Sequence, residues 1–443
     1  MATNNPVRTS GDTALLERRR RLLGPAYRLF YDRPVHLVRG EGVWLYDAQG
    51  LRYLDAYNNV ASVGHCHPKV VAALAQQAGV LNTHTRYLHD AVLDYAERLL
   101  NLFPAELGHV MFTCTGSEAN DLALRVARAG TGGTGVIVTQ FAYHGVTSAL
   151  AELSPSLGPQ VPLGSHVRTV PAPAIDGNGI GQAFARHVEV AIEDMRCNGI
   201  KPAALLVDTI FSSDGVRADP PGFLAEAVAA IRAAGGVFIA DEVQPGFGRT
   251  GSHMWGFQRH DLTPDIVTLG KPMGNGHPLA GMVCRPELLR TFGERSRYFN
   301  TFGGNPVSAQ VGLAVLDVMK EERLQQNACR VGRYLKNALR DLATRHELIG
   351  DVRGEGLFVG VEFVKDRTTG EPATSETAHI VNAMRERRVL TGAASPQGNV
   401  LKLRPPLTFS EQHADLFLEA MESVLVGVEE YRLDIGIDRR GEL

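Results

Sequence analysis

Short apolar segments alternate with helical segments through the middle of the chain, from about residue 67 to residue 281. Strands are expected at residues 109–113, 136–139, 203–207, 237–240, 266–268 and 280–284. Helices such as 118–128 and 222–233 lie between several of these strands. Such alternation produces βαβ units, and consecutive βαβ units build a mainly parallel sheet covered by helices. The sequence therefore predicts an α/β fold.

The two ends of the chain show a different pattern of predicted helices and strands. A helix at 13–23 precedes short strands at 35–39, 43–46 and 51–54. A long helical segment from 307 to about 345, broken once or twice, leads into strands at 357–364 and 400–403 and helices at 377–387 and 410–431. Because 443 residues exceed one typical domain, we expect two. The simplest arrangement is a large domain at 67–306 and a smaller α+β domain from both chain ends, 1–66 and 307–443, the latter including the connecting helix.

The composition argues against several classes of protein. A formal net charge of −3 gives no basis for binding nucleic acid or an anionic membrane surface. No apolar run reaches the roughly 18 residues of a membrane-spanning helix, and residues 1–12 lack the apolar core of a signal peptide. Five scattered cysteines favour a reducing compartment, so we expect a cytoplasmic protein. His65-Cys66-His67 is the one metal-like cluster, but it lacks partner ligands at useful spacing, so no metal site is expected.

A lysine and an aspartate stand at the ends of two expected strands. Lys271 follows the apolar run 265–268 in a glycine-rich turn, and Asp241 follows the strand 237–240. Ligands of open α/β sheets bind beyond the carboxyl ends of the strands. The pair suits a Schiff-base cofactor, with an amine to bond its aldehyde and a carboxylate to pair with its pyridinium nitrogen. Taken singly, each residue has an ordinary alternative, a surface lysine or a helix N-cap.

Two further turns suit a phosphorylated ring. The strand 109–113 leads through Gly116 and Ser117 into a helix, and a helix N-terminus with a close glycine backbone forms an anion site. The segment 141–145 follows the next strand and offers the aromatic face of Tyr143 beside His144. Residues 300–306, which include Thr301, form another polar glycine turn before a helix. An ordinary N-cap and a core aromatic are the alternatives for the first two.

These motifs together resemble the class III aminotransferases, which are fold-type I pyridoxal phosphate enzymes. The resemblance rests on Gly-Ser-Glu-Ala-Asn, Tyr-His-Gly, Asp-Glu-Val-Gln-Pro-Gly-Phe-Gly-Arg-Thr-Gly, Gly-Lys-Pro-Met-Gly-Asn-Gly and Thr-Phe-Gly-Gly-Asn-Pro, in order between residue 44 and about residue 431. It implies pyridoxal 5'-phosphate as cofactor and a homodimer with shared active sites. The implied cofactor residues are Lys271 (Schiff base), Asp241 (ring nitrogen), Gly116 and Ser117 (phosphate), Tyr143 with His144 (ring face), Val243 (opposite face), Gln244 (ring hydroxyl) and Thr301 (phosphate in the neighbouring subunit).

Three positions depart from the aminotransferase pattern. Lys402 stands where classical members carry the arginine that grips the substrate carboxylate, and Arg404 follows two residues later on the same strand face. Ser213 stands where the glutamate that pairs with that arginine would be, and Asn58 replaces a substrate-facing tyrosine. Lysine does not replace a bidentate arginine conservatively and suits a phosphate better.

The double asparagine Asn58-Asn59, residues 82–90 and the segment 402–406 together resemble the phospho-lyase branch of the family, which includes ethanolamine-phosphate and phosphohydroxylysine phospho-lyases. The resemblance implies elimination of phosphate from O-phosphoethanolamine, giving acetaldehyde, ammonia and phosphate. Lys402, Arg404 and Asn58 are the candidates for gripping the phosphate of this small phosphorylated amine. Two alternatives stay open: an ω-transaminase with a relaxed pocket, which needs an amino acceptor, and a non-catalytic scaffold of the same fold.

Overall fold

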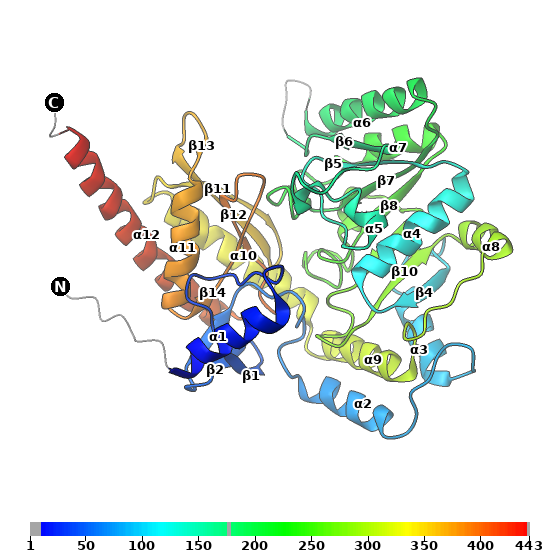
Figure 1. Cartoon of the computed structure of the whole chain (residues 1–443), viewed down its shortest axis with the longest axis horizontal. Helices are drawn as coiled ribbons and strands as arrows, with labels where there is room; N and C mark the ends of the chain where they lie inside the picture. The colour runs from blue at the N-terminus through cyan, green and yellow to red at the C-terminus, as the bar shows by residue number, and fades with distance from the viewer. Residues whose placement is uncertain (1–9, 175–178, 441–443) are drawn as a thin grey trace.

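A seven-stranded sheet forms the centre of the larger lobe of the computed structural model, which describes residues 10–174 and 179–440 (Figure 1). Its strand order is β4 (His109–Thr113), β10 (Ala280–Cys284), β9 (Ile266–Leu269), β8 (Val237–Asp241), β7 (Pro202–Asp208), β5 (Gly135–Thr139) and β6 (Val167–Val170). β10 runs antiparallel to both neighbours, while β9, β8, β7, β5 and β6 pair in parallel. The predicted α/β fold with a mainly parallel sheet is confirmed.

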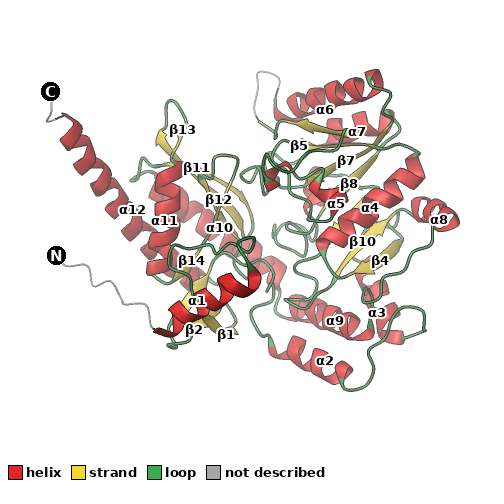
Figure 2. Ribbon diagram, in the orientation of Figure 1, coloured by secondary structure: helices red, strands yellow, loops and turns green. Residues whose placement is uncertain are grey.

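Helices cover both faces of this sheet (Figure 2). On one face lie α4 (Gly116–Thr131) and α8 (Pro286–Arg295), and on the other lie α6 (Ile180–Cys197) and α7 (Ala225–Ala233). Alternate strand residues enter two separate apolar clusters: Val136, Val138, Ala204, Leu206 and Ile239 pack on the α4 side, whereas Ile137, Leu205, Val207, Phe238 and Ala240 pack on the other side. A sheet buried on both faces needs near-continuous apolar strands, which is why the strands are visible in the sequence.

Elements from the two chain ends lie together in the smaller lobe, blue beside orange and red in Figure 1. One sheet has the order β1 (Leu37–Glu41), β2 (Trp44–Asp47), β3 (Arg52–Asp55) and β14 (Val389–Leu390), so a C-terminal strand pairs with an N-terminal one. A second sheet contains β11 (Ile349–Glu355), β12 (Phe358–Asp366), β16 (Val400–Leu403) and β15 (Ala393–Ala394), with β13 (Glu371–Pro372) paired to β12. The helices here are α1 (Ser10–Leu23), α10 (Leu324–Ala343), α11 (Thr374–Glu386) and α12 (Glu411–Arg440).

The remaining elements are α2 (Pro68–Ala78), α3 (Asp90–Leu100), the short α5 (Ser148–Ala151), α9 (Pro306–Glu321) and the 3-10 turns η1 (Pro155–Leu157) and η2 (Gly256–His260). The predicted break in the helical segment from residue 307 lies between α9 and α10, where Arg323 adopts a φ of 53°. The domain boundaries at residues 67 and 307 stay a prediction, and the first nine residues of the proposed N-terminal part lie outside the described structure.

Two further observations concern the membrane-span and metal-cluster questions raised by the sequence. Within the described residues, no helix is both long and apolar enough to cross a membrane. The members of the His65-Cys66-His67 cluster do not converge: His65 contacts Asp55 at 2.7 Å, and His67 contacts Glu322 at 2.9 Å. The two rings are thus held by different carboxylates.

Candidate active site

Residues from the carboxyl ends of several strands line one cavity. Gly116 and Ser117 follow β4, Tyr143 and His144 follow β5, Asp208 ends β7, Asp241 ends β8 and Lys271 follows β9. Val243 and Gln244, just beyond Asp241, complete the wall. These strands point the same way, so their ends meet at one edge of the sheet, where open α/β folds bind ligands. Of the predicted cofactor residues, all except Thr301 line this cavity.

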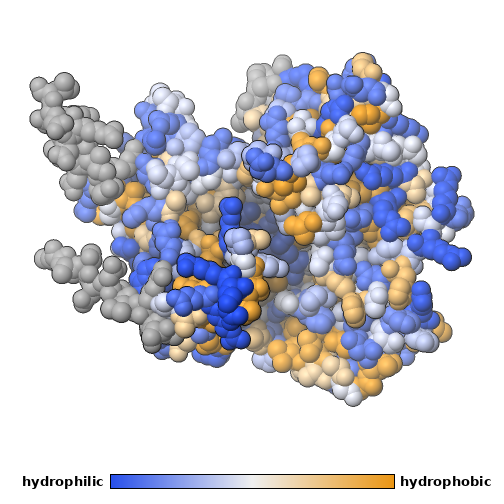
Figure 3. All heavy atoms as spheres, in the orientation of Figure 1, coloured by the Kyte–Doolittle hydropathy of each residue, from blue (hydrophilic) through white to orange (hydrophobic). Residues whose placement is uncertain are grey.

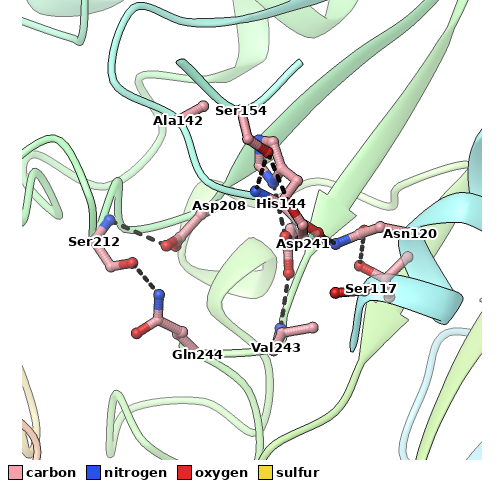
Figure 4. Close-up of polar contacts among 12 residues, drawn as sticks. Ser117, Asn120, Ala142, His144, Ser154, Asp208, Ser212, Asp241, Val243 and Gln244 are labelled. Carbon is pink, nitrogen blue, oxygen red and sulfur yellow. Dashed lines mark hydrogen bonds and ion pairs between the residues drawn. The ribbon is translucent and has the colours of Figure 1, made fainter. Parts of the chain in front are cut away.

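Asp241 is a buried carboxylate held by three donors (Figure 4). Its Oδ2 accepts hydrogen bonds from Asn120 Nδ2 at 2.9 Å and from His144 Nδ1 at 2.8 Å, and its Oδ1 accepts one from the backbone N–H of Val243 at 3.1 Å. Asn120 is itself fixed, because its Oδ1 accepts from Thr268 at 2.6 Å. The carboxylate therefore has a set orientation. His144, predicted beside the ring face, contacts Asp241 and thus acts through it.

The amino group of Lys271 makes no hydrogen bond or ion pair within the described part of the chain, although its side chain is partly buried. Burial lowers the pKa of Lys271; nearby Asp241 opposes this shift, and Arg404 adds to it. A lowered pKa favours the neutral amine, which is the form that can attack an aldehyde or accept a proton.

The N-terminus of α4 is arranged to receive an anion. Thr115 caps the helix with its side chain, which accepts from Glu118 N, and the Glu118 carboxylate reaches back to the backbone N–H groups of Cys114 and Thr115. The N–H groups of Gly116 and Ser117 have no partner among the described residues. These groups, with the positive end of the helix dipole, suit the phosphate of a cofactor.

Gly116 also has a packing role at the cavity. A Cβ at this position would lie 3.0 Å from Val243 Cγ2 and 3.1 Å from Val243 Cγ1. Gly270, next to Lys271, is almost as close to Val243, with 3.3 Å to Cγ1. The two glycines thus let Val243 pack tightly between the α4 turn and the lysine turn.

A chain of side chains leads from the cavity to the predicted substrate residues. The backbone N–H of Ser212 donates to Asp208 at 3.1 Å, and Ser212 Oγ accepts from Gln244 Nε2 at 2.6 Å (Figure 4). Gln244 Oε1 in turn accepts from Arg404 Nη1 at 2.7 Å. Arg404 is buried, and its guanidinium lies 4.7 Å from the ring centroid of Tyr57. Gln244, predicted at the ring hydroxyl, therefore also orients Arg404.

Lys402 lies on β16, two residues before Arg404, and its amino group donates to the backbone carbonyl of Ser212 at 3.3 Å. Neither cation has an ion pair within the described residues. Burial lowers the pKa of Lys402 well below its usual value, and the neighbouring positive charge of Arg404 lowers it further. Asp208 does not neutralise the pair by contact, because its oxygens accept from the N–H groups of Ile210 and Ser212.

Four predicted residues lie outside the cavity wall: Lys402 and Arg404, described above, and Thr301 and Asn58. Thr301 is exposed in the loop before α9, where a role in a neighbouring subunit would place it. Asn58 uses its Oδ1 in a local turn, accepting from Val60 N at 3.0 Å. The adjacent Asn59 instead has a buried amide nitrogen without a partner in the described structure. The structure thus leaves the roles of Thr301 and Asn58 as predictions.

Sequence reasoning missed three residues of this network. The sequence pattern could have indicated Asn120, because it lies four residues after Gly116 and so shares its helix face. It could also have indicated Asp208, a carboxylate at the end of the strand that pairs with β8. No pattern could have indicated Ser212, because its contact with Gln244 depends on how two separate loops fold.

The family model for class-III aminotransferases matches residues 30–425. The chain belongs to this family. Its predicted fold, family and cofactor are confirmed: it is a pyridoxal 5'-phosphate-dependent enzyme of the class III family. The cavity fits the cofactor, since it presents a buried carboxylate together with an amine and helix N-terminal N–H groups that have no partner in the described ranges 10–174 and 179–440. The part that each residue plays toward the cofactor remains a prediction.

Relatives in the family differ in the activity that their names state. A Drosophila melanogaster protein named alanine–glyoxylate aminotransferase 2-like is 41% identical over 438 residues, covering 95% of this chain and 88% of its own. A Caenorhabditis elegans protein named ethanolamine-phosphate phospho-lyase homolog 1 is 37% identical over 434 residues, covering 93% of each.

Solved structures show the same division. A phospholyase from Arthrobacter in complex with phosphoethanolamine superposes with a TM-score of 0.90 at 46% identity, covering 93% of this chain and 99% of that one. A transaminase from the marine bacterium Virgibacillus superposes with a TM-score of 0.86 at 26% identity, covering 94% and 99%. The comparisons thus establish the family and the cofactor, and both reaction types occur among the similar proteins.

Proposed function

We propose that this enzyme is a phospho-lyase that eliminates phosphate from O-phosphoethanolamine. The observation that carries the proposal is the pair of basic side chains Lys402 and Arg404, each close enough to Lys271 for their charges to affect one another. Lys402 and Arg404 have no acidic partner within ion-pair distance in the described structure. A buried charge without a counter-ion is costly, so the pair favours an anionic ligand. A phosphate monoester carries close to two negative charges at neutral pH and matches two cations better than a carboxylate does.

The position of Ser213 supports the same reaction. An amino-acid transaminase must admit two different substrates to one pocket, and a glutamate that pairs with the carboxylate-binding arginine is one device for that. This chain has Ser213 and Lys402 at the two positions. The Arthrobacter structure that binds phosphoethanolamine adds support, as a relative of high identity.

The protein's side chains divide the work of elimination. When bound, pyridoxal phosphate supplies an electron sink, and the Asp241 carboxylate stabilises its protonated ring nitrogen. Lys271, as a neutral amine, removes a proton from the carbon that bears nitrogen. Arg404 and Lys402 hold the phosphate on the adjacent carbon, where preorganised cations stabilise charge as it develops on the leaving oxygen. Overall, phosphoethanolamine and water give acetaldehyde, ammonium and hydrogen phosphate.

Phosphate release without an amino acceptor tests the proposal. The holoenzyme is incubated with O-phosphoethanolamine and no keto acid, and phosphate and acetaldehyde are measured over many turnovers. We expect the two products one for one. If turnover instead stops after one equivalent and resumes only when a keto acid such as pyruvate is added, the enzyme is an ω-transaminase, as the names of several relatives suggest.

We also propose that the enzyme is a homodimer with shared active sites. Apolar residues gather at the surface over α2, in the lower part of Figure 3. Exposed apolar side chains also lie in two loops. Leu88 is in the loop before α3, and Phe302 directly follows Thr301. Burial of this surface by a second copy would bring Thr301 to the neighbouring cofactor, and sedimentation of the holoenzyme tests it. The cytoplasmic location stays a prediction; three of the relatives are named as mitochondrial.

A further inference from the structure

Elimination of a phosphate monoester requires a proton donor for the leaving group. At neutral pH the ester is largely a dianion, since its second pKa is about 6. If the carbon–oxygen bond breaks with its electron pair on oxygen and nothing else happens, phosphate leaves as a trianion, which is a very basic leaving group. A proton must reach the departing group as the bond breaks. Cations that only hold the phosphate do not supply that proton.

The described residues around the site offer few donors for this step. A guanidinium such as Arg404 does not release a proton near neutral pH. Lys271 is engaged at the other carbon, from which it takes a proton. Tyr57 lies against the guanidinium of Arg404, and burial raises the pKa of Tyr143. Two donors therefore lie beside Arg404, the Tyr57 hydroxyl and the ammonium of Lys402, and burial lowers the pKa of Lys402, which favours release of its proton.

The contacts of Lys402 leave its protons available. Its amino group makes one hydrogen bond within the described chain, a long one of 3.3 Å to the carbonyl of Ser212, and no described carboxylate forms an ion pair with it. The backbone fixes its position, because Lys402 pairs with Gly360 of β12 and its N–H donates to the Gly392 carbonyl at 2.8 Å. Neither neighbour carries a charge. Because only the long hydrogen bond to Ser212 holds the amino group, the side chain can rotate from the Ser212 carbonyl toward a phosphate bound by Arg404.

We propose that Lys402 is the acid that protonates the leaving phosphate, an inference that rests on the proposed phospho-lyase function. Lys271 takes the proton from the first carbon, and the electron pair of that C–H bond becomes the carbon–carbon double bond. The carbon–oxygen bond breaks with its pair on oxygen, Lys402 gives that phosphate one proton, and hydrogen phosphate departs. Lys402 is left as a neutral amine and regains its proton from water.

The charges that face Lys402 agree with this role. Arg404 on the same segment and Lys271 after β9 favour its neutral form, whereas Asp208 and Asp214 after β7 favour its ammonium form. α11 packs on this sheet through apolar side chains such as Ile380 and Met384. Burial dominates, so the pKa of Lys402 in the free enzyme is low, and an arriving phosphate dianion raises it again. Phosphate binding should therefore take up a proton.

Replacing Lys402 by arginine separates phosphate binding from proton donation, because arginine keeps the positive charge but cannot release a proton. With O-phosphoethanolamine, Lys402→Arg should keep KM within several-fold of wild type while kcat falls by about 10²–10⁴-fold, the usual effect of losing a general acid. Lys402→Met should lose phosphate binding as well. The decisive substrate is 2-aminoethyl sulfate, whose sulfate leaves without needing a proton. Lys402→Arg should eliminate sulfate at close to the wild-type rate.

A second readout does not depend on turnover. Titration of inorganic phosphate into the holoenzyme, in buffers of different ionisation enthalpy and above the second pKa of phosphate, should show proton uptake for wild type and less for Lys402→Arg. If Lys402→Arg keeps its kcat on phosphoethanolamine, or slows equally on both esters, Lys402 is not the acid, while phosphate release by wild type still upholds the lyase. If wild type releases no phosphate, the proposed function fails and this inference fails with it.

Discussion

Replacing Asp241 by asparagine changes one atom of a carboxylate that three donors surround. An ionised carboxylate only accepts, whereas an amide presents an NH₂ on one side. If the amide oxygen faces Asn120 and His144, the new NH₂ faces the N–H of Val243, which lies 3.1 Å from Oδ1. If the amide is turned, the NH₂ faces the Nδ2 of Asn120, at 2.9 Å from Oδ2, and the ring of His144, at 2.8 Å. Every orientation leaves donors facing each other.

The cheaper orientation loses one hydrogen bond to a charged group, worth about 1.5–3 kcal/mol. The contact with the protonated ring nitrogen of the cofactor belongs to the same class and is lost in addition. Only the contact with the ring nitrogen strengthens during the reaction, so its loss of about 1.5–3 kcal/mol should slow proton abstraction by about 10–10²-fold, whereas the lost Val243 contact lowers stability. The fold should survive, because the change removes no apolar contact.

The assay is the rate of phosphate release from O-phosphoethanolamine and from the same substrate deuterated at the carbon that bears nitrogen. Asp241→Asn should lower the rate and show a full isotope effect. Asp208→Asn is the comparison, because it removes the same charge from the wall of the same cavity but leaves the Asp241 network intact; since Asp208 also contacts Ser212 and affects Lys402, the rates are compared at saturating substrate. Equal losses in both variants, or an unchanged rate in Asp241→Asn when the isotope effect shows that proton abstraction is limiting, would refute the reasoning.

Three further outcomes are expected. Lys271→Ala should lose both turnover and the visible absorbance band of the covalently bound cofactor, even if cofactor still binds noncovalently. Gly116→Ala should weaken cofactor binding by about 1–3 kcal/mol through overpacking, since its Cβ would lie 3.0 Å from Val243 Cγ2; adding Val243→Ala should recover part of the loss in an equilibrium titration. Arg404→Ala should weaken phosphoethanolamine binding by about 1.5–3 kcal/mol but barely affect a neutral amine of similar size, so equal losses for both would indicate a folding role.

The central sheet was largely predictable because its strands are buried on both faces. β4 and β10 have the predicted bounds, and β5, β7, β8 and β9 differ from prediction by one residue at one or both ends. β6 was missed, and so was α6. The sequence Val167-Arg168-Thr169-Val170 lies at the sheet edge, with its two central residues only partly buried, so it lacks the apolar run that marks the inner strands. α7 begins at Ala225 rather than at the predicted residue 222, because Gly222 adopts a φ of 90°, which no helix continues.

The predicted cofactor residues were easier to identify as one group than the predicted substrate residues, because different features of the fold bring the two groups together. Each cofactor residue except Thr301 follows a strand of the central sheet, so strand order alone brings these residues together. The predicted substrate residues instead lie in or beside segments near residues 57, 212 and 404, which are far apart in the chain. They meet through contacts such as Arg404 N to the Ala56 carbonyl at 2.9 Å and Ser395 N to the Ser213 carbonyl at 3.2 Å. No spacing in the sequence encodes these contacts, so the sequence predicts the cofactor chemistry, while the structure is needed to show that Ser212, Gln244 and Arg404 form one network.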